Sequence, residues 1–210
     1  MRLILVRHGE TEWNRQSRIV GHTEIPLNEM GRKQAALLAH ALRDEKPSVI
    51  YASPLQRTRE TAAEISRVLG VQVQFDDALK EIAAGDIDGL TFEEVAENHS
   101  DFFKHWMRGD PSLRLPGGES FTDLRNRTWP LLQRIVSEHT DGDVIIVSHT
   151  LAIMSMIAAA LGMATADFRR IRLNIASISI LEFKDGKASL LLFNDTCHWK
   201  DLGKAEGRVL

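Results

Sequence analysis

Two histidines each follow a short apolar run and one polar residue, in the dipeptides Arg7-His8 and Ser148-His149. Arg7 and Arg57 carry planar guanidinium groups, which match the geometry of phosphate oxygens better than a lysine does. His8 stands among these arginines and belongs to no metal-ligand spacing such as His-Glu-x-x-His. A histidine in that setting is suited to attack phosphorus, because covalent catalysis divides one difficult displacement into two easier ones. These residue types therefore indicate phosphoryl chemistry.

The elements that would position these side chains are two predicted strands. Residues 3–6 and 144–147 are short runs rich in branched apolar residues, which are typical of strands buried on both faces of a sheet. Ligands of parallel sheets bind beyond the carboxyl ends of the strands, so His8 and His149 would share one crevice if these strands are neighbours. A helix that follows His149 could add backbone N–H donors for an anion. The alternative is that the histidines mark two unrelated polar strand ends.

The rest of the chain alternates strand and helix patterns. Asn28, Thr91 and Ser120 are capping residues ahead of helical apolar spacing, and Asp185-Gly186 marks a hairpin turn. We expect strands at residues 3–6, 48–52, 71–75, 143–148, 175–183 and 188–193, and helices at residues 28–45, 57–69, from 91, 120–139 and 151–161. This order predicts an α/β fold. It is a three-layer sandwich with a mostly parallel central sheet, helices on both faces and an antiparallel pair near the end.

Composition limits the possible functions. The 210 residues include 26 Lys+Arg and 29 Asp+Glu, and the formal charge of −3 gives no global attraction for nucleic acid or an anionic membrane. The length allows one core and no linker divides it, so we expect a single domain over residues 1–210. Cys197, the only cysteine, excludes an internal disulfide and a multi-cysteine zinc site. Since the sequence shows no signal core or spanning segment, the expected location is the cytoplasm.

Four blocks of sequence occur in a defined order and spacing. They are Arg7-His8-Gly9-Glu10-Thr11-Glu12-Trp13-Asn14, Ser53-Pro54-Leu55-Gln56-Arg57-Thr58-Arg59-Glu60-Thr61, Leu79-Lys80-Glu81-Ile82 and Ser148-His149-Thr150. Together they resemble the histidine phosphatase superfamily, whose members include the cofactor-dependent phosphoglycerate mutases. The resemblance extends from about residue 1 to residue 198, which is nearly the whole chain.

The resemblance implies a role for each of these residues. His8 would be the nucleophile that forms a phosphohistidine, and Arg7, Arg57 and His149 would bind the transferred phosphoryl group. Glu81 would protonate the leaving alkoxide and then deprotonate the attacking water. Burial and a bound phosphate dianion would raise the pKa of Glu81, whereas the arginines would lower it. No cofactor or metal ion is expected, and three residues would line the substrate pocket: Asn14, Gly21 and Thr150.

Other residues have structural interpretations. Arg59 and Arg127 are expected to form surface ion pairs, and Cys197 is expected to be buried and inert. Without the resemblance, Asn14 and Gly21 would pass as a helix-start residue and a turn glycine. Five further histidines are expected to be solvated and three aromatic residues to pack in the core: His22, His40, His99, His105 and His139, and Trp106, Phe121 and Trp129.

Three functions fit these residues. The chain could be a phosphatase, a mutase that returns the phosphoryl group to another hydroxyl, or a non-catalytic phosphate-binding regulatory module. The third is disfavoured because each catalytic position carries the expected residue type. Residues 82–115 form a short segment, with seven acidic residues against three cations, Lys104, Arg108 and Arg114. A short, acidic cover suits hydrolysis, because a mutase must exclude water from the phosphohistidine and retain a bisphosphate.

Two blocks bear on the substrate. Ser148-His149-Thr150 and Asn194-Asp195-Thr196-Cys197-His198 resemble the metal-independent phosphoserine phosphatases. Two positions depart from relatives, since Ile87 stands where many phosphatases have an aromatic residue and Thr150 where many relatives have glycine. We therefore expect a small-molecule phosphomonoester as substrate, with phosphoserine as a candidate, and a monomer or a homodimer.

Overall fold

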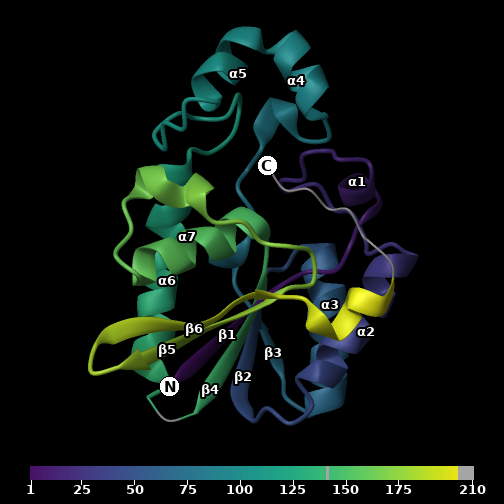
Figure 1. Cartoon of the computed structure of the whole chain (residues 1–210), viewed down its shortest axis with the longest axis vertical. Coiled ribbons are helices and arrows are strands. Elements are labelled where there is room, and N and C mark those ends of the chain that lie inside the picture. Colours follow the sequence, from purple (N-terminus) through teal and green to yellow (C-terminus); the bar gives the residue numbers. More distant parts are fainter. Residues whose placement is uncertain (141, 203–210) are drawn as a thin grey trace.

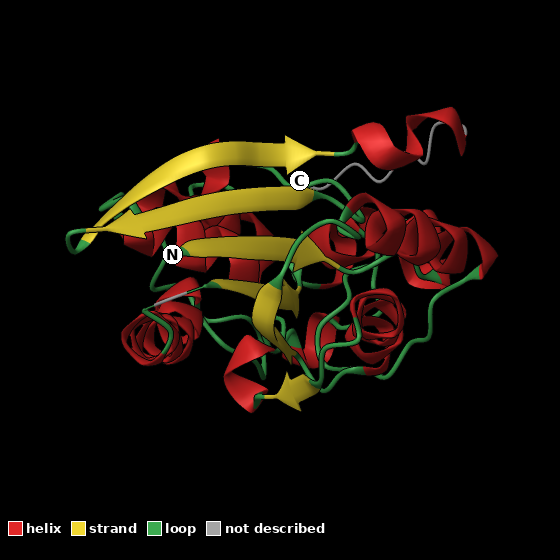
Figure 2. Cartoon of the chain, turned by 90° about the horizontal axis from the view of Figure 1, so that it is seen from below, coloured by secondary structure: helices red, strands yellow, loops and turns green. Residues whose placement is uncertain are grey.

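The computed structural model describes residues 1–140 and 142–202, and a six-stranded sheet lies at its centre (Figure 1). The strand order is β3 (Val73–Phe75), β2 (Pro47–Ala52), β4 (Asp143–Ser148), β1 (Arg2–Arg7), β5 (Ile178–Lys184) and β6 (Lys187–Asp195). The first four strands run parallel, whereas β5 is antiparallel to both β1 and β6. Figure 2 shows the β5–β6 hairpin at one edge of the sheet. The predicted mostly parallel sheet with an antiparallel pair is confirmed.

Both faces of the central strands are buried. Successive side chains of β1 point to opposite faces, so Leu3 and Leu5 enter one apolar cluster while Ile4 and Val6 enter another. Two pairs of helices cover these clusters, as Figure 1 shows: α6 (Phe121–Glu138) with α7 (Thr150–Ala160), and α2 (Glu29–Ala41) with α3 (Gln56–Leu69). The predicted three layers are therefore confirmed.

The predicted capping residues and turn residues stand at the starts of three helices and in the hairpin turn. The side chain of Asn28 caps α2 by accepting from the Gly31 amide at 2.8 Å. Capping boxes at Thr91 and Ser120 begin α4 (Phe92–Asn98) and α6. Asp185 and Gly186 both have positive φ, 51° and 72°, and they form the turn between β5 and β6.

Several boundaries differ from the sequence prediction. Helix α2 ends at Ala41 and not near residue 45, because the following residues turn before Pro47, which disfavours helix in the residue before it. Strand β3 begins at Val73, two residues later than expected. Strand β5 begins at Ile178 and not at 175, because Ala176 has a φ of 51° and its amide donates to the His8 carbonyl.

Residues 82–115 form a small cap. It contains the 3₁₀ turn η2 (Gly85–Ile87), helix α4 and helix α5 (Ser100–Trp106), and α5 was not predicted, nor was the short α1 (Glu12–Arg15). Figure 1 shows α4 and α5 beyond the carboxyl ends of the parallel strands. Trp106 packs there, with its ring centroid 5.3 Å from that of Phe92. Within the described residues, no helix is both long and apolar enough to cross a membrane.

Candidate active site

The two strand-end histidines lie side by side. The register of β1 and β4 pairs Arg7 with Ser148, and the next residue of each strand is a histidine. The His8 amide donates to the Ser148 carbonyl at 3.1 Å, and the ring centroids of His8 and His149 are 5.1 Å apart. Both side chains are buried. The pairing of β1 with β4 thus brings together residues that are 141 positions apart in the chain.

The backbone fixes the tautomer of His8. Its Nδ1 lies 2.7 Å from the Gly9 carbonyl oxygen, which can only accept a hydrogen bond. Nδ1 therefore carries the proton of the neutral ring, and Nε2 keeps its lone pair. Burial, followed by the charges of Arg57 and Arg7, lowers the pKa of His8 well below its ordinary value. The ring is neutral near pH 7 and has the form that a nucleophile requires.

His149 has the opposite tautomer. The Nε of Arg57 donates to His149 Nδ1 at 3.2 Å, so the proton is on Nε2, which lies 2.8 Å from the Ser53 hydroxyl. Burial first, and then the charge of Arg57, lowers the pKa of His149 well below its ordinary value. His149 is therefore a neutral donor in this structure, and it would become a third positive group only if an anion raised its pKa.

Two buried arginines flank the histidines. Arg57 donates to the carbonyls of Thr23 at 3.1 Å and Gly21 at 2.6 Å, and Arg7 donates to the Leu173 carbonyl at 2.7 Å. Burial lowers the pKa of each guanidinium to about 10, although Glu81 acts in the opposite direction. Both arginines are therefore charged at neutral pH. The buried Nε of Arg7 has no hydrogen-bond partner within the described residues, and a phosphate oxygen could supply one.

Glu81 is held by two backbone amides. Its Oε1 accepts from Ile82 at 2.8 Å and its Oε2 accepts from Leu151 at 3.1 Å. Leu151 lies in the first turn of α7, so this amide, which the sequence suggested for an anion, binds Glu81 instead. Burial raises the pKa of Glu81 overall, against the two N–H bonds and the charges of Arg57 and Arg7. The sequence left the direction of this shift open, and the structure gives it as upward.

Gly21 belongs to a loop that holds Arg57. The Asp88 carboxylate accepts from the Gly21 amide at 2.8 Å and from the Thr23 amide at 3.1 Å. A Cβ at residue 21 would lie 2.7 Å from the Cβ of Ala84, so only glycine allows this close approach. Asp88 was not predicted from the sequence, because the loop that it binds is more than 60 residues away in the chain.

The other two predicted pocket residues have structural roles here. The Asn14 Oδ1 accepts from the Thr11 amide at 3.1 Å and the Thr11 hydroxyl at 2.9 Å, and so completes the capping box of α1. Thr150 is buried and begins α7 directly after His149. For both residues, contact with a substrate stays a prediction.

Two structural interpretations are wrong. Arg127 does not form a simple surface ion pair, because its side chain is only 22% exposed and donates to the carbonyls of Ala78, Lys80 and Glu81 in addition to pairing with Glu119. No local pattern signals these contacts, since the carbonyls lie more than 45 residues earlier in the chain. Cys197 was expected to be buried, but it is exposed because it begins the turn after the edge strand β6.

The other structural expectations had mixed outcomes. Arg59 is exposed, but it forms no ion pair with the described residues and instead donates to the Pro54 carbonyl at 2.8 Å, so the expected surface ion pair is wrong. His22 is exposed, but its Nε2 also lies 2.8 Å from the Glu81 carbonyl oxygen. Phe121 is buried and Trp129 packs against the same core cluster.

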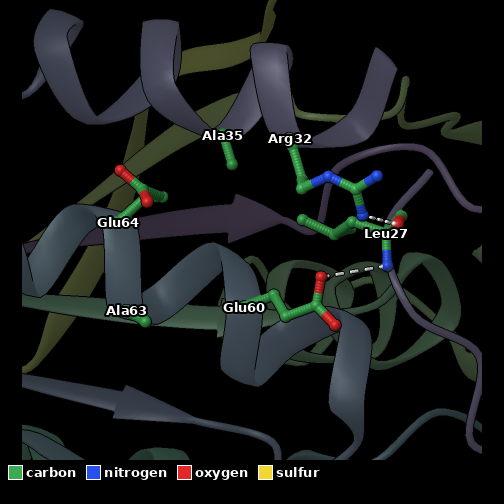
Figure 3. A pocket seen from close by; sticks show the side chains of 6 residues that line it. All are labelled: Leu27, Arg32, Ala35, Glu60, Ala63 and Glu64. Atoms are coloured by element: carbon green, nitrogen blue, oxygen red, sulfur yellow. Dashed lines mark hydrogen bonds between the residues drawn. The ribbon is translucent and has the colours of Figure 1, made fainter. Parts of the chain in front are cut away.

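A hollow of about 240 Å³ lies elsewhere, between α2 and α3 (Figure 3). The hollow shares no residue with the histidine and arginine cluster. It is lined by Leu27, Arg32, Ala35, Glu60, Ala63 and Glu64. The backbone of Leu27 bonds to Arg32 on one side and to Glu60 on the other, as Figure 3 shows.

Nowhere in residues 1–140 and 142–202 do three His, Cys, Asp or Glu side chains gather in a way that could hold a metal ion.

The sheet, with buried histidines and arginines side by side at its carboxyl edge, defines an α/β fold with a polar site beyond the parallel strands. The family model of the histidine phosphatase superfamily (branch 1) matches residues 3–196. The chain belongs to this superfamily, and it is a phosphatase.

Named relatives agree on the class and differ in substrate. Phosphoserine phosphatase 1 of Hydrogenobacter thermophilus is 37% identical over 198 residues, which cover 94% of each chain. The probable phosphoglycerate mutase GpmB of Salmonella paratyphi C is 30% identical over 187 residues, with 89% of this chain and 87% of the relative covered. The solved structure of mycobacterial glucosyl-3-phosphoglycerate phosphatase Rv2419c has a TM-score of 0.84 and 30% identity, covering 93% of this chain and 99% of that one.

Proposed function

We propose that this chain hydrolyses small phosphomonoesters through a phosphohistidine intermediate on His8. The observation that carries the proposal is the neutral, tautomerically fixed His8 beside two buried arginines. A neutral imidazole offers a lone pair, and the guanidinium groups of Arg7 and Arg57 supply the positive charge that three phosphate oxygens need.

In the first step, the His8 Nε2 lone pair attacks phosphorus and the ester P–O bond breaks. The proton stays on Nδ1, and its hydrogen bond to the Gly9 carbonyl oxygen stabilises the positive charge of the phosphorylated ring. Glu81 gives its proton to the leaving alkoxide oxygen, and the upward shift of its pKa favours the protonated form that this step requires. His149 would donate its Nε2 hydrogen bond to a phosphoryl oxygen in exchange for the Ser53 hydroxyl, which it contacts in this structure.

In the second step, water attacks phosphorus and the P–N bond breaks, so that the electron pair returns to His8 Nε2. The Glu81 carboxylate takes the proton of the water and regains its starting form. Inorganic phosphate is then released from its position between Arg7 and Arg57. The cycle balances without a metal ion or a further co-reactant.

The substrate that we propose is a small phosphorylated acid, with phosphoserine first among the candidates. The support is the 37% identity with Hydrogenobacter phosphoserine phosphatase 1 over almost the full length of both chains. Asn14 and Thr150 would contact the part of the substrate beyond the phosphate. Because the Asn14 Oδ1 is taken by Thr11, its amino group would make such a contact.

A mutase is the second candidate, and the GpmB relative is the observation that favours it. The decisive experiment supplies 3-phosphoglycerate, phosphoserine and glucosyl-3-phosphoglycerate in parallel, and measures released phosphate together with 2-phosphoglycerate. We expect phosphate release to exceed isomer formation, because the 82–115 cap carries more acidic residues than cations and opposes retention of a bisphosphate. Isomer that appears faster than phosphate, especially after priming with bisphosphoglycerate, would favour the mutase.

Metal independence is tested separately. The two arginines take the place that Mg²⁺ has in many phosphoryl-transfer sites, so we expect full activity after dialysis against a chelator. Loss of activity in the chelator, with recovery on addition of a divalent ion, would contradict this expectation.

A further inference from the structure

Glu81 lies on a loop whose backbone is bound by a side chain from a distant helix. Arg127, on α6, donates through Nη1 to the carbonyls of Ala78 and Lys80 at 2.9 and 2.8 Å. Its Nη2 donates to the carbonyl of Glu81 itself at 2.7 Å. One guanidinium group therefore binds three carbonyl oxygens within four consecutive residues, and a guanidinium has enough donors in a fixed plane to do so.

Glu119 completes this arrangement from the loop that precedes α6. Its carboxylate accepts from Nε and Nη2 of Arg127, both at 2.9 Å, and also from the Ala83 amide at 2.9 Å. The Glu119 amide donates in turn to the Ala83 carbonyl at 2.9 Å. The ion pair thus holds the chain on both sides of Glu81.

Both partners are about four-fifths buried, with side-chain exposures of 22% for Arg127 and 21% for Glu119. An ion pair in such a position costs desolvation energy and stabilises a fold little compared with apolar packing. Arg127 donates five hydrogen bonds to three backbone carbonyls and one carboxylate. These bonds instead restrict the backbone around Glu81 to one geometry. We propose that Arg127 and Glu119 are positioning residues that set the direction of the Glu81 carboxyl group.

The proposal rests on the proposed function, because it concerns the proton that Glu81 transfers. Arg127 contacts the Glu81 carbonyl, whereas the Glu81 carboxyl oxygens are bound by the amides of Ile82 and Leu151. Loss of Arg127 should therefore displace the carboxyl group without removing it. A shift of about 1 Å in a reacting group can cost on the order of 100-fold in rate.

The expected signature is selectivity for the leaving group. A poor alkoxide leaving group needs the Glu81 proton as the P–O bond breaks, whereas 4-nitrophenolate leaves without it. The ratio of kcat/KM for an alkyl phosphate to that for 4-nitrophenyl phosphate reports this first step alone, because kcat/KM ends at the first irreversible step. We expect Arg127→Ala to lower that ratio by about 10- to 100-fold.

Arg134→Ala is the matched control. Arg134 lies two turns further along the same face of α6. It binds the Asp76 carboxylate at 2.7 Å, a few residues before the Glu81 loop, and does not contact Glu81. A general loosening of the segment would affect both variants alike. We expect Arg134→Ala to leave the ratio unchanged, Arg127→Lys to recover part of it, and Glu119→Gln to lower it in the same direction as Arg127→Ala.

Glu81→Gln, measured in the same series, separates the acid role of Glu81 from the positioning role of Arg127. If Glu81→Gln itself does not lower the ratio, the acid role of Glu81 is wrong, whatever Arg127 does. If Glu81→Gln lowers the ratio while Arg127→Ala lowers both kcat/KM values equally, or matches Arg134→Ala, then Arg127 is structural and the proposal is overturned. Thermal unfolding midpoints of all variants identify a loss that comes from unfolding.

Discussion

At the scale of single residues, the chemistry of His8 depends on one nitrogen. Its Nδ1 is occupied by the Gly9 carbonyl, so Nε2 is the atom that would attack phosphorus in the mechanism that we propose. Burial first, and then the charges of Arg57 and Arg7, lowers the pKa of the ring and prevents the protonation that would remove this lone pair. The environment therefore provides an unprotonated nucleophile without a general base.

The first prediction follows from that atom. His8→Ala should abolish turnover and leave the fold intact, because among residues 1–140 and 142–202 the ring hydrogen-bonds only to the adjacent Gly9 carbonyl. Acid-labile labelling by a ³²P-phosphorylated substrate should disappear with it, and circular dichroism should be unchanged. His40→Ala, at an exposed histidine of α2, is the control and should keep both activity and labelling. A variant His8→Ala that retains a sizeable fraction of the rate would show direct attack by water.

The second prediction concerns the proton on Glu81. Glu81→Gln should reduce kcat/KM for alkyl phosphates by roughly 10²–10⁴-fold and reduce it much less for 4-nitrophenyl phosphate. Since the pKa of Glu81 is raised, the wild-type kcat/KM for alkyl phosphates should fall as the pH rises through that pKa, when the acid loses its proton. The variant should lack this alkaline decline. Equal losses on both substrate types would remove Glu81 from the acid role.

At the scale of elements, the cap and the sheet share control of Arg57. Asp88 follows the η2 turn of the cap and holds the Gly21–Thr23 loop, and the carbonyls of that loop hold the Arg57 guanidinium. The Thr23 hydroxyl also donates to Asp88 at 2.9 Å. The cap therefore contacts Arg57 through the carbonyls of this loop, and it would affect the phosphate binding that we propose for Arg57 in this way.

The third prediction tests this connection. Asp88→Ala should raise KM for phosphomonoesters by about tenfold, since a hydrogen bond to a charged group contributes roughly 1.5–3 kcal/mol and about 1.4 kcal/mol changes affinity tenfold. The leaving-group ratio should stay near that of the wild type, because Glu81 is not displaced. Asp86→Ala, at an exposed position two residues earlier, is the control. A KM unchanged in both variants would mean that Arg57 keeps its position without the loop.

At the scale of the whole molecule, the site carries a cost in stability. His8 and His149 are buried as neutral rings and Arg7 and Arg57 as cations, all at one edge of the sheet. A free histidine titrates at 6.5, and both rings have a lower pKa in the folded chain. Below pH 6.5 the unfolded chain therefore binds protons that the folded chain does not, and unfolding is favoured.

The fourth prediction is that the free energy of unfolding falls as the pH is lowered from 6.5. Each histidine should contribute up to about 1.4 kcal/mol per pH unit. Glu81 has a raised pKa and acts in the opposite sense, but burial also lowers the pKa of His198, which adds to the effect of His8 and His149. Denaturant unfolding at several pH values measures the slope, and His149→Gln should reduce it while His40→Gln should not. A slope unaffected by His149→Gln would place the acid sensitivity elsewhere.

The sequence by itself determined the class of the protein. The strands before His8 and His149 can be predicted because strands buried on both faces are apolar at consecutive positions. The helix starts can be predicted because Asn28, Thr91 and Ser120 cap backbone amides only a few residues further along the chain. The four blocks then identified the superfamily that the comparison confirms over residues 3–196. A single domain over residues 1–210 stays a prediction.

Only the tertiary structure decided how the site residues are held. The tautomer of His149, the direction of the Glu81 pKa shift, and the contacts of Asp88 and Arg127 all depend on partners from other elements. Residue patterns report periodicity and local hydrogen bonding, whereas burial and backbone carbonyl positions arise from packing between segments far apart in the chain. For that reason Arg127 was read as a surface residue, although its helix carries it to the backbone of the loop that bears Glu81.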